Sequence, residues 1–228
     1  FYRCAAQRPE ALIDGLFRRA FGRLTARLAR RLGAGGLDLA EDCVQHAMWQ
    51  AERLWPRHGT PQQPEAWLAT VARNAALDRL KHRDAGATAV HTLSVWQPDH
   101  ADFGGDQGFD EELRDDTLRL MFAACHPALP EAARVALTLK TVCGFSVGEI
   151  SRAFLMQESA VAQQIVRAKA LIRERSIAFA IPDPPQIAER LDSVLRALYL
   201  LFNEGYLASG GEVALRDDLA QDAIRLAT

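Results

Sequence analysis

Apolar residues recur every three to four positions along most of the chain, the spacing that predicts amphipathic helices. The first stretch covers residues 16–32 and is followed by closely spaced glycines, which end helices. The second covers 38–54 and opens with Asp38-x-x-Glu41, a predicted capping box. A proline- and glycine-rich loop from Pro56 precedes a third helix over about 65–84. Three helices with short breaks predict one small bundle.

The periodicity lapses over residues 86–112, where glycines and acidic residues accumulate, and this composition predicts a flexible linker. Further on, Ser146-x-x-Glu149 predicts a second capping box, followed by a short helix, a turn at 155–157 and a longer helix. A last helix and a Gly210–Gly211 turn predict a hairpin. We therefore expect an all-α protein with this organisation: a helical bundle domain over 1–85, an acidic linker over 86–112, a domain with a helix-turn-helix over 113–181, and a C-terminal helical hairpin over 182–228.

Charge is segregated along the chain, so the net charge of −2 does not exclude nucleic acid. Residues 1–36 hold eight Arg and two acidic residues, a balance of +6, whereas residues 99–116 hold eight acidic residues and one Arg, a balance of −7. The four cysteines have no CxxC spacing, and the six histidines form no ligand motif. No apolar run is long enough to span a membrane. We expect reduced, partly buried thiols, no metal, no cofactor, no enzymatic activity and a cytoplasmic location.

The predicted helix-turn-helix at 146–174 is the strongest candidate for a chemical role, because such a motif presents its second helix to the major groove. Four apolar positions of that helix would face the domain, and amide and cationic side chains would face DNA. These candidate DNA contacts are Glu158, Ser159, Gln163, Gln164, Arg167 and Lys169. The alternative is a helical hairpin whose basic face is only solvated.

Two other helices have candidate surfaces. The polar side of the 65–84 helix combines cations, an amide and an aromatic residue, which suits contact with phosphates and unstacked bases: Trp67, Arg73, Asn74, Asp78, Arg79, Lys81 and Arg83. The 38–54 helix carries acidic and amide groups around a Trp outside its apolar stripe, which suits a protein interface: Asp38, Glu41, Asp42, Gln45, Trp49 and Arg53. The alternatives are an ordinary solvated face for the first and a Trp at the bundle edge for the second.

Taken in order, three segments resemble the extracytoplasmic-function sigma factors of bacterial RNA polymerase. Residues 38–45 look like the segment that grips the polymerase clamp helices, and 66–79 are similar to the helix that reads the −10 element. Residues 144–150 with 166–169 look like the helix-turn-helix that reads the −35 element. The stretch 198–206 resembles the start of a helical, tetratricopeptide-like extension found in one subgroup.

The resemblance implies a promoter-specificity factor that binds core RNA polymerase and promoter DNA, with Asn74 at the position of the family's base-pocket Asn. It also implies control by an anti-sigma protein or by the C-terminal extension within the same chain. Ala162 departs from the pattern, because relatives often carry Arg there, and this leaves the −35 sequence open. The rival hypotheses are a stand-alone helix-turn-helix regulator and a helical interaction scaffold.

Overall fold

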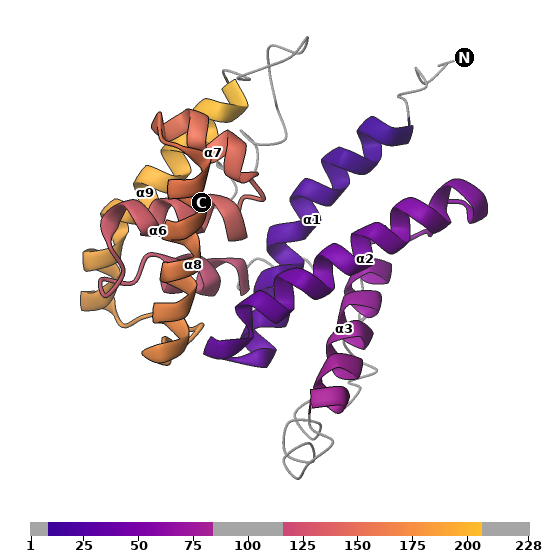
Figure 1. Cartoon of the computed structure of the whole chain (residues 1–228), viewed down its shortest axis with the longest axis horizontal. Helices are drawn as coiled ribbons and strands as arrows, with labels where there is room; N and C mark the ends of the chain where they lie inside the picture. Colours follow the sequence, from indigo (N-terminus) through magenta and orange to yellow (C-terminus); the bar gives the residue numbers. More distant parts are fainter. Residues whose placement is uncertain (1–8, 84–115, 207–228) are drawn as a thin grey trace.

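The computed structural model describes residues 9–83 and 116–206, and every regular element among them is a helix (Figure 1). The all-α prediction is therefore confirmed. The predicted linker at 86–112 and the helix expected after the Gly210–Gly211 turn lie outside the described residues. In chain order the helices are α1 (Pro9–Leu32), the 3₁₀ turn η1 (Ala34–Gly36), α2 (Leu37–His58), α3 (Pro64–Arg83), an unlabelled helix over 116–124, α6 (Glu131–Thr141), α7 (Val147–Phe154), α8 (Glu158–Glu174) and α9 (Pro184–Tyr206).

Helices α1, α2 and α3 form the first group, in which α2 contacts both α1 and α3. Small side chains on the buried side of α2, Ala40, Ala47 and Ala51, let its neighbours approach closely. Phe21 and Leu24 of the predicted α1 stripe and Val44 of the predicted α2 stripe are buried in this core, whereas Leu54, at the end of the α2 stripe, is exposed. At one end Trp55 lies between Phe17 and Trp67, with ring centroids 5.8 and 5.6 Å apart. These edge-to-face and tilted contacts fix where α3 leaves α2.

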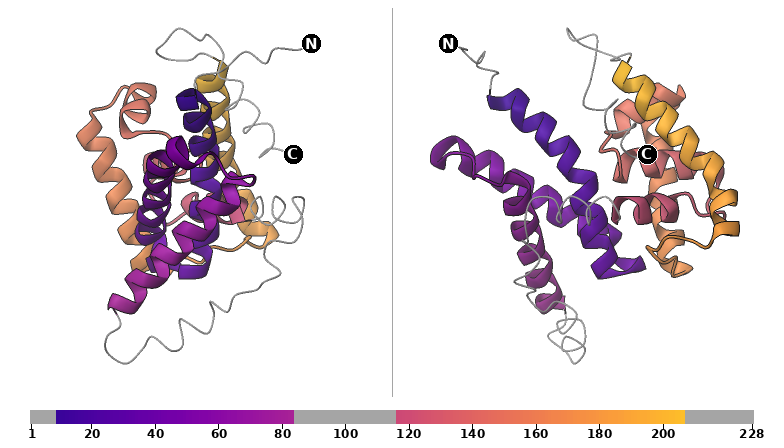
Figure 2. Two further views of the ribbon diagram at one scale, coloured as in Figure 1. Left: turned by 90° about the vertical axis from the view of Figure 1, so that its right-hand side faces the viewer. Right: turned by 180° about the vertical axis from the view of Figure 1, so that it is seen from behind.

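The second group consists of the 116–124 helix and α6 to α9. α6 is its centre, since it contacts α7, α8 and α9, and its residues from Val135 to Leu139 are all buried. α9 lies on the side of this group that faces away from α1–α3 (Figure 2). Arg190 of α9 donates to the carbonyl of Phe122 at 3.0 Å, and Val194, Ala197 and Leu198 are buried. α9 is thus part of the core of this group.

Helix boundaries agree with local signals except at α2. Ser146 caps α7 as predicted: its hydroxyl accepts from the Glu149 N–H at 3.2 Å, and the Glu149 carboxylate accepts from the Ser146 N–H at 2.7 Å. The capping box predicted at Asp38 and Glu41 is wrong. α2 begins one residue earlier, at Leu37, after Gly36, and neither side chain caps it. The loop predicted from Pro56 is also later than expected, because α2 continues through Pro56 to His58.

The two groups contact each other at several points, among them α1 against α6 and η1 against α8. A Cβ atom at Gly22 would lie 1.8 Å from the carbonyl oxygen of Val142, so only glycine allows this approach. Nearby, Arg30 binds the buried Asp116 at 2.7 Å. Burial raises the pKa of the Asp116 carboxyl, although Arg30 and Arg119 oppose the shift. Buried residues of both groups form one continuous core.

Candidate DNA and partner interfaces

The helix-turn-helix comprises α7, a turn at 155–157 and α8. Ile150 of α7 and Val161, Ile165, Ala168 and Ile172 of α8 are buried, as the periodicity predicted. The turn is made by Leu155, which has φ 52° and ψ 40°, the left-handed conformation. The Leu155 N–H donates to the carbonyl oxygens of Arg152 and Ser151, which gives these groups at the C-terminus of α7 a hydrogen-bond partner.

The candidate −35 residues do not all lie on one face of α8. Ser159, Gln163 and Arg167 are exposed and lie at spacings of four residues, so they line one side of the helix. Glu158 is also exposed at the N-terminus of α8, and Gln164 is half-buried next to α6. The exposed side and the N-terminus of α8 can therefore approach a duplex.

Lys169 lies on another side of α8, which faces the first group. Its ammonium contacts the carboxylates of Glu41 at 2.8 Å and of Asp38 at 3.0 Å. Burial by itself lowers the pKa of Lys169, but the two carboxylates outweigh it, so the pKa lies above its ordinary value. A candidate DNA contact is thus paired with two candidate polymerase contacts, a relation that the sequence did not predict.

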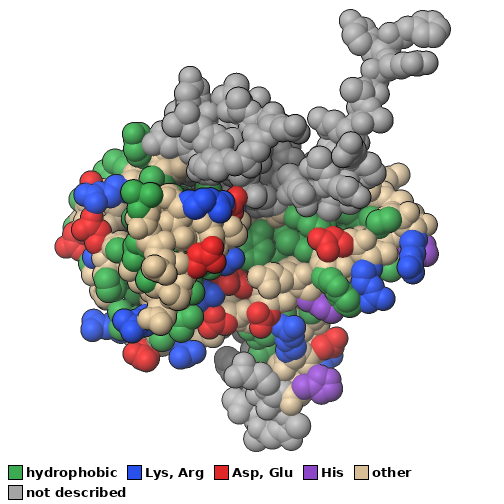
Figure 3. Space-filling view, turned by 45° about the horizontal axis from the view of Figure 1, so that its top comes forward, with side chains coloured by type: hydrophobic (Ala, Val, Ile, Leu, Met, Phe, Trp, Pro, Cys, Tyr) green, Lys and Arg blue, Asp and Glu red, His purple; other side chains and the backbone are tan. Residues whose placement is uncertain are grey.

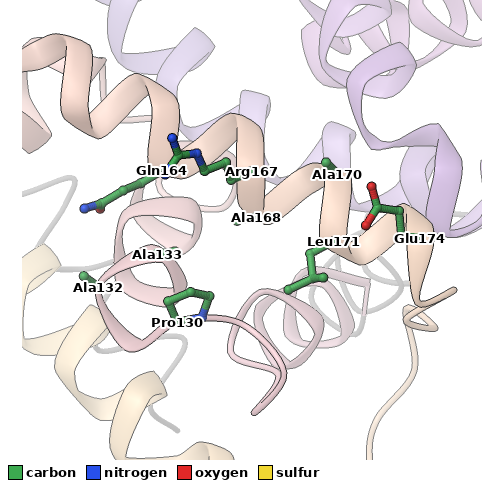
Figure 4. A pocket seen from close by; sticks show the side chains of 9 residues that line it. All are labelled: Pro130, Ala132, Ala133, Gln164, Arg167, Ala168, Ala170, Leu171 and Glu174. Carbon is green, nitrogen blue, oxygen red and sulfur yellow. The ribbon is translucent and has the colours of Figure 1, made fainter.

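A groove of about 500 Å³ separates α8 from the start of α6 (Figure 4). Pro130, Ala132 and Ala133 form one wall. Gln164 lies at one end of the groove and Glu174 at the other, with Leu171 between them. The groove is mostly apolar, and Gln164 and Arg167 bring polar groups to its edge. The space next to the candidate DNA-binding side of α8 is thus open.

On α3, the candidate −10 residues divide into an exposed stripe and a partly buried set. Asn74, Asp78 and Lys81 are exposed at spacings of four and three residues, so they share one side of the helix. Arg79 is half-buried and lies 3.7 Å from the Asp42 carboxylate. Trp67 is half-buried against Trp55, and Arg73 is also half-buried. The side chain of Arg83 lies outside the described part of the chain.

On α2, five of the six candidate polymerase contacts form one exposed stripe: Asp38, Asp42, Gln45, Trp49 and Arg53. Trp49 is 48% exposed, so the bundle covers only part of its ring. The Arg53 guanidinium lies 4.6 Å from the centre of the Trp49 ring, and His46 lies beside the same ring at 5.9 Å. Glu41 is the exception, because it is buried next to Lys169.

Three other features would bear on function in the described residues: reactive thiols, metal-site geometry and membrane-spanning helices. Cys43, Cys125 and Cys143 are buried, and burial raises the pKa of the Cys43 and Cys125 thiols. No group of three His, Cys, Asp or Glu residues within 9–83 and 116–206 has the geometry of a metal site. None of the helices described here combines the length and the apolar character that a membrane crossing requires. On the face drawn in Figure 3, acidic and basic side chains are interspersed over both groups.

A helix-turn-helix with an exposed polar side, next to a second helical group with its own polar stripes, is an arrangement typical of multi-helical DNA-binding proteins. Residues 17–86 match sigma-70 region 2, and residues 119–172 match sigma-70 region 4. The chain therefore belongs to the sigma-70 family, of the extracytoplasmic-function type. The two matches cover the helices in which the candidate sites lie. They do not test the individual site residues, which stay predictions.

Two further comparisons bear on the rest of the chain. Residues 190–228 match a family of unknown function, DUF6596. An uncharacterized protein of Rhizobium meliloti (strain 1021) is 42% identical over 192 residues, which are 83% of this chain and 45% of that protein. The chain thus spans less than half the length of this curated relative. No solved structure gives a significant match.

Proposed function

We propose that the chain is a promoter-specificity sigma factor, which binds core RNA polymerase and directs initiation by reading a −10 and a −35 element. The observation that carries the proposal is the order of the two matched regions. Sigma-70 region 2 coincides with α1–α3, and region 4 ends with the helix-turn-helix. Sigma factors are non-enzymatic, and we propose that this chain acts in the cytoplasm, where promoter DNA and polymerase meet.

In this proposal α8 enters the major groove of the −35 duplex. Gln163 and Gln164 are suited to adenine, and Arg167 is suited to guanine or phosphate. Ser159 and Glu158 lie at the N-terminus of α8, the part of a recognition helix closest to the bases. Lys169 joins the DNA contacts only after its contacts with Asp38 and Glu41 break.

The first group would supply the other two contacts. The stripe of Asn74, Asp78 and Lys81 on α3 would hold an unstacked base of the −10 strand, with the partly buried Trp67, Arg73 and Arg79 supporting it. The stripe on α2 would bind core polymerase, with Trp49 and Arg53 as its centre, because exposed aromatic and arginine side chains dominate many protein interfaces.

The test is reconstitution of the chain with core polymerase, followed by mapping of the start sites that the complex selects on fragmented genomic DNA. We expect start sites that share two upstream elements. Asn74→Ala should weaken discrimination at the −10 element, and Arg167→Ala should weaken it at the −35 element, each about tenfold or more. Glu189→Ala, an exposed substitution on α9, is the control and should leave selection unchanged.

The same experiment separates the rival functions. A stand-alone regulator would bind duplex DNA tightly without polymerase, whereas a sigma factor binds promoter DNA well only with core enzyme. A helical scaffold would be indifferent to both substitutions. Start sites without shared upstream elements, or tight sequence-specific binding by the free chain, would refute the proposal.

A second proposal concerns regulation by the C-terminal helix, as an alternative to a separate anti-sigma protein. Arg196 of α9 binds Glu131 at the start of α6, and Arg134 of α6 donates to the Ser193 hydroxyl of α9 at 3.3 Å. α9 is therefore placed to influence the helix that supports the helix-turn-helix. Arg196→Glu should change transcription by the reconstituted complex without changing the sequence it selects; unchanged transcription would count against this idea.

A further inference from the structure

One apolar side chain lies on the exposed side of α8, among the polar groups proposed to read DNA. Val166 is 65% exposed. Of the large hydrophobic residues that are exposed in the described ranges, it is the one on the recognition helix; the others lie on α2, on α9, in the turn at Leu155 and at Ile181. Val166 belongs neither to the polar positions of α8 nor to its buried stripe, so helical periodicity does not single it out.

The position of Val166 follows from helical geometry. It comes three residues after Gln163 and directly before Arg167, both of which are exposed. Helix residues three apart have Cβ atoms about 5–6 Å apart. Since base pairs are stacked about 3.4 Å apart, side chains at 163 and 166 can reach the same or neighbouring base pairs. The buried stripe of α8 occupies the opposite side of the helix, so Val166 contributes nothing to the core.

We propose that Val166 contacts the C5-methyl group of a thymine in the major groove, and that this contact determines specificity at the −35 element. The inference rests on the proposed function and deepens it. The thymine methyl is the one apolar group that base pairs present in the major groove, and small apolar side chains are its usual partners. Val166 cannot accept or donate a hydrogen bond, so it can read a base only in this way.

A contact between Val166 and a thymine methyl group constrains the sequence of the −35 element. The −35 element selected by this chain contains an A·T pair whose thymine methyl faces α8. Gln163, suited to adenine, lies within reach of the same or the neighbouring pair. A −35 element without thymine on either strand would overturn the inference even where the sigma function holds.

The decisive experiment changes the DNA and leaves the protein intact. The chain with core polymerase selects a promoter from a library randomised over the −35 element, and each thymine of that element is then replaced in turn by deoxyuridine. This replacement removes the methyl group and leaves base pairing unchanged. One replacement should weaken promoter binding about fourfold, the equivalent of roughly 0.8 kcal/mol for one buried methyl group. If every replacement is silent, the inference is wrong.

Variants at position 166 then test whether Val166 is the residue that contacts the thymine methyl group. Val166→Ser removes both methyl groups of the side chain, so it should bind the thymine and deoxyuridine promoters equally. Val166→Thr keeps one methyl group and should recover part of the difference. Leu195→Ala, which shortens another exposed apolar residue, is the matched control and should retain the full difference. Thermal unfolding of each variant checks folding.

The outcomes separate this inference from the proposed function. If the complex does not discriminate among −35 sequences, the sigma proposal itself fails. If it discriminates and a deoxyuridine effect is present, but Val166→Ser keeps that effect, another residue reads the methyl group and the inference is overturned. Equal binding by Val166→Ser, together with partial recovery by Val166→Thr, supports it.

Discussion

At the scale of single residues, Leu155 shows how a local conformation is retained at an energetic cost. Its side chain is 95% exposed, and its backbone is left-handed, with φ 52°. Left-handed backbone is unfavourable for a residue with a Cβ atom, by about 1–2 kcal/mol. Because the side chain has little packing to lose, the strain at Leu155 is not offset by burial.

Leu155→Gly should therefore stabilise the chain. Glycine relieves the strain, but it also gives the unfolded chain more freedom, which removes about 0.4–1 kcal/mol of the gain. We expect a net increase of about 0.5 kcal/mol in the free energy of unfolding, measured in urea. Leu155→Ala is the control, because it keeps the Cβ atom and the strain. A glycine variant less stable than the alanine variant would show that the turn is not strained.

At the scale of elements, the capping box of α7 involves only Ser146 and Glu149, so one substitution can measure its contribution to the free energy of unfolding. Ser146→Ala removes the hydroxyl that accepts from the Glu149 N–H, so the start of α7 loses a hydrogen-bond partner. Such a loss lowers stability by about 1 kcal/mol. Ser159→Ala, in the exposed first turn of α8, is the control and should change the free energy of unfolding by less than about 0.5 kcal/mol. Equal effects of the two substitutions in urea unfolding would argue against the cap.

The two predicted capping boxes show what the sequence could and could not supply. Ser146 and Glu149 satisfy each other locally, and the sequence was sufficient to find them. Asp38 and Glu41 have the same spacing, but the Glu41 carboxylate accepts a hydrogen bond from Lys169, 128 residues further along the chain. Periodicity predicted the buried stripes of α2 and α8 because burial repeats with the helix turn. It could not predict which exposed or charged residues meet across the two groups.

At the scale of the whole molecule, Gly22 sets how closely the two groups approach. Gly22→Ala places a Cβ atom against the Val142 carbonyl oxygen, so α1 and α6 must move apart. Overpacking lowers stability by about 1–3 kcal/mol, and a contact of 1.8 Å with a backbone oxygen belongs at the upper end of that range. The loss therefore exceeds the gain of about 1 kcal/mol from replacing glycine within a helix. Gly35→Ala is the control, since its nearest contact would be the Arg173 side chain at 3.7 Å. Small-angle scattering should detect a larger radius of gyration for Gly22→Ala alone.

Lys169 also connects the two groups, through its ion pairs with Asp38 and Glu41. The proposed function requires these three residues to contact other partners. The Lys169 ammonium is nearly buried, as is Glu41, whereas Asp38 is largely exposed. In the proposed complex with polymerase, Lys169 would contact DNA, and Asp38 and Glu41 would contact protein. The arrangement described here and the promoter-bound arrangement therefore cannot share these ion pairs.

Lys169→Met should destabilise the free chain, because it leaves the Glu41 carboxylate buried without its partner. We expect a loss of about 1–3 kcal/mol, below the range for fully buried pairs because Asp38 is exposed to solvent. Glu41→Gln in the same background should restore part of this loss, since it removes the unpaired charge. Arg167→Met, at an exposed position two residues away, is the control and should change stability by less than about 0.5 kcal/mol. In a double-mutant cycle of urea unfolding, additive effects of the Lys169 and Glu41 substitutions would mean that this ion pair does not hold the two groups together.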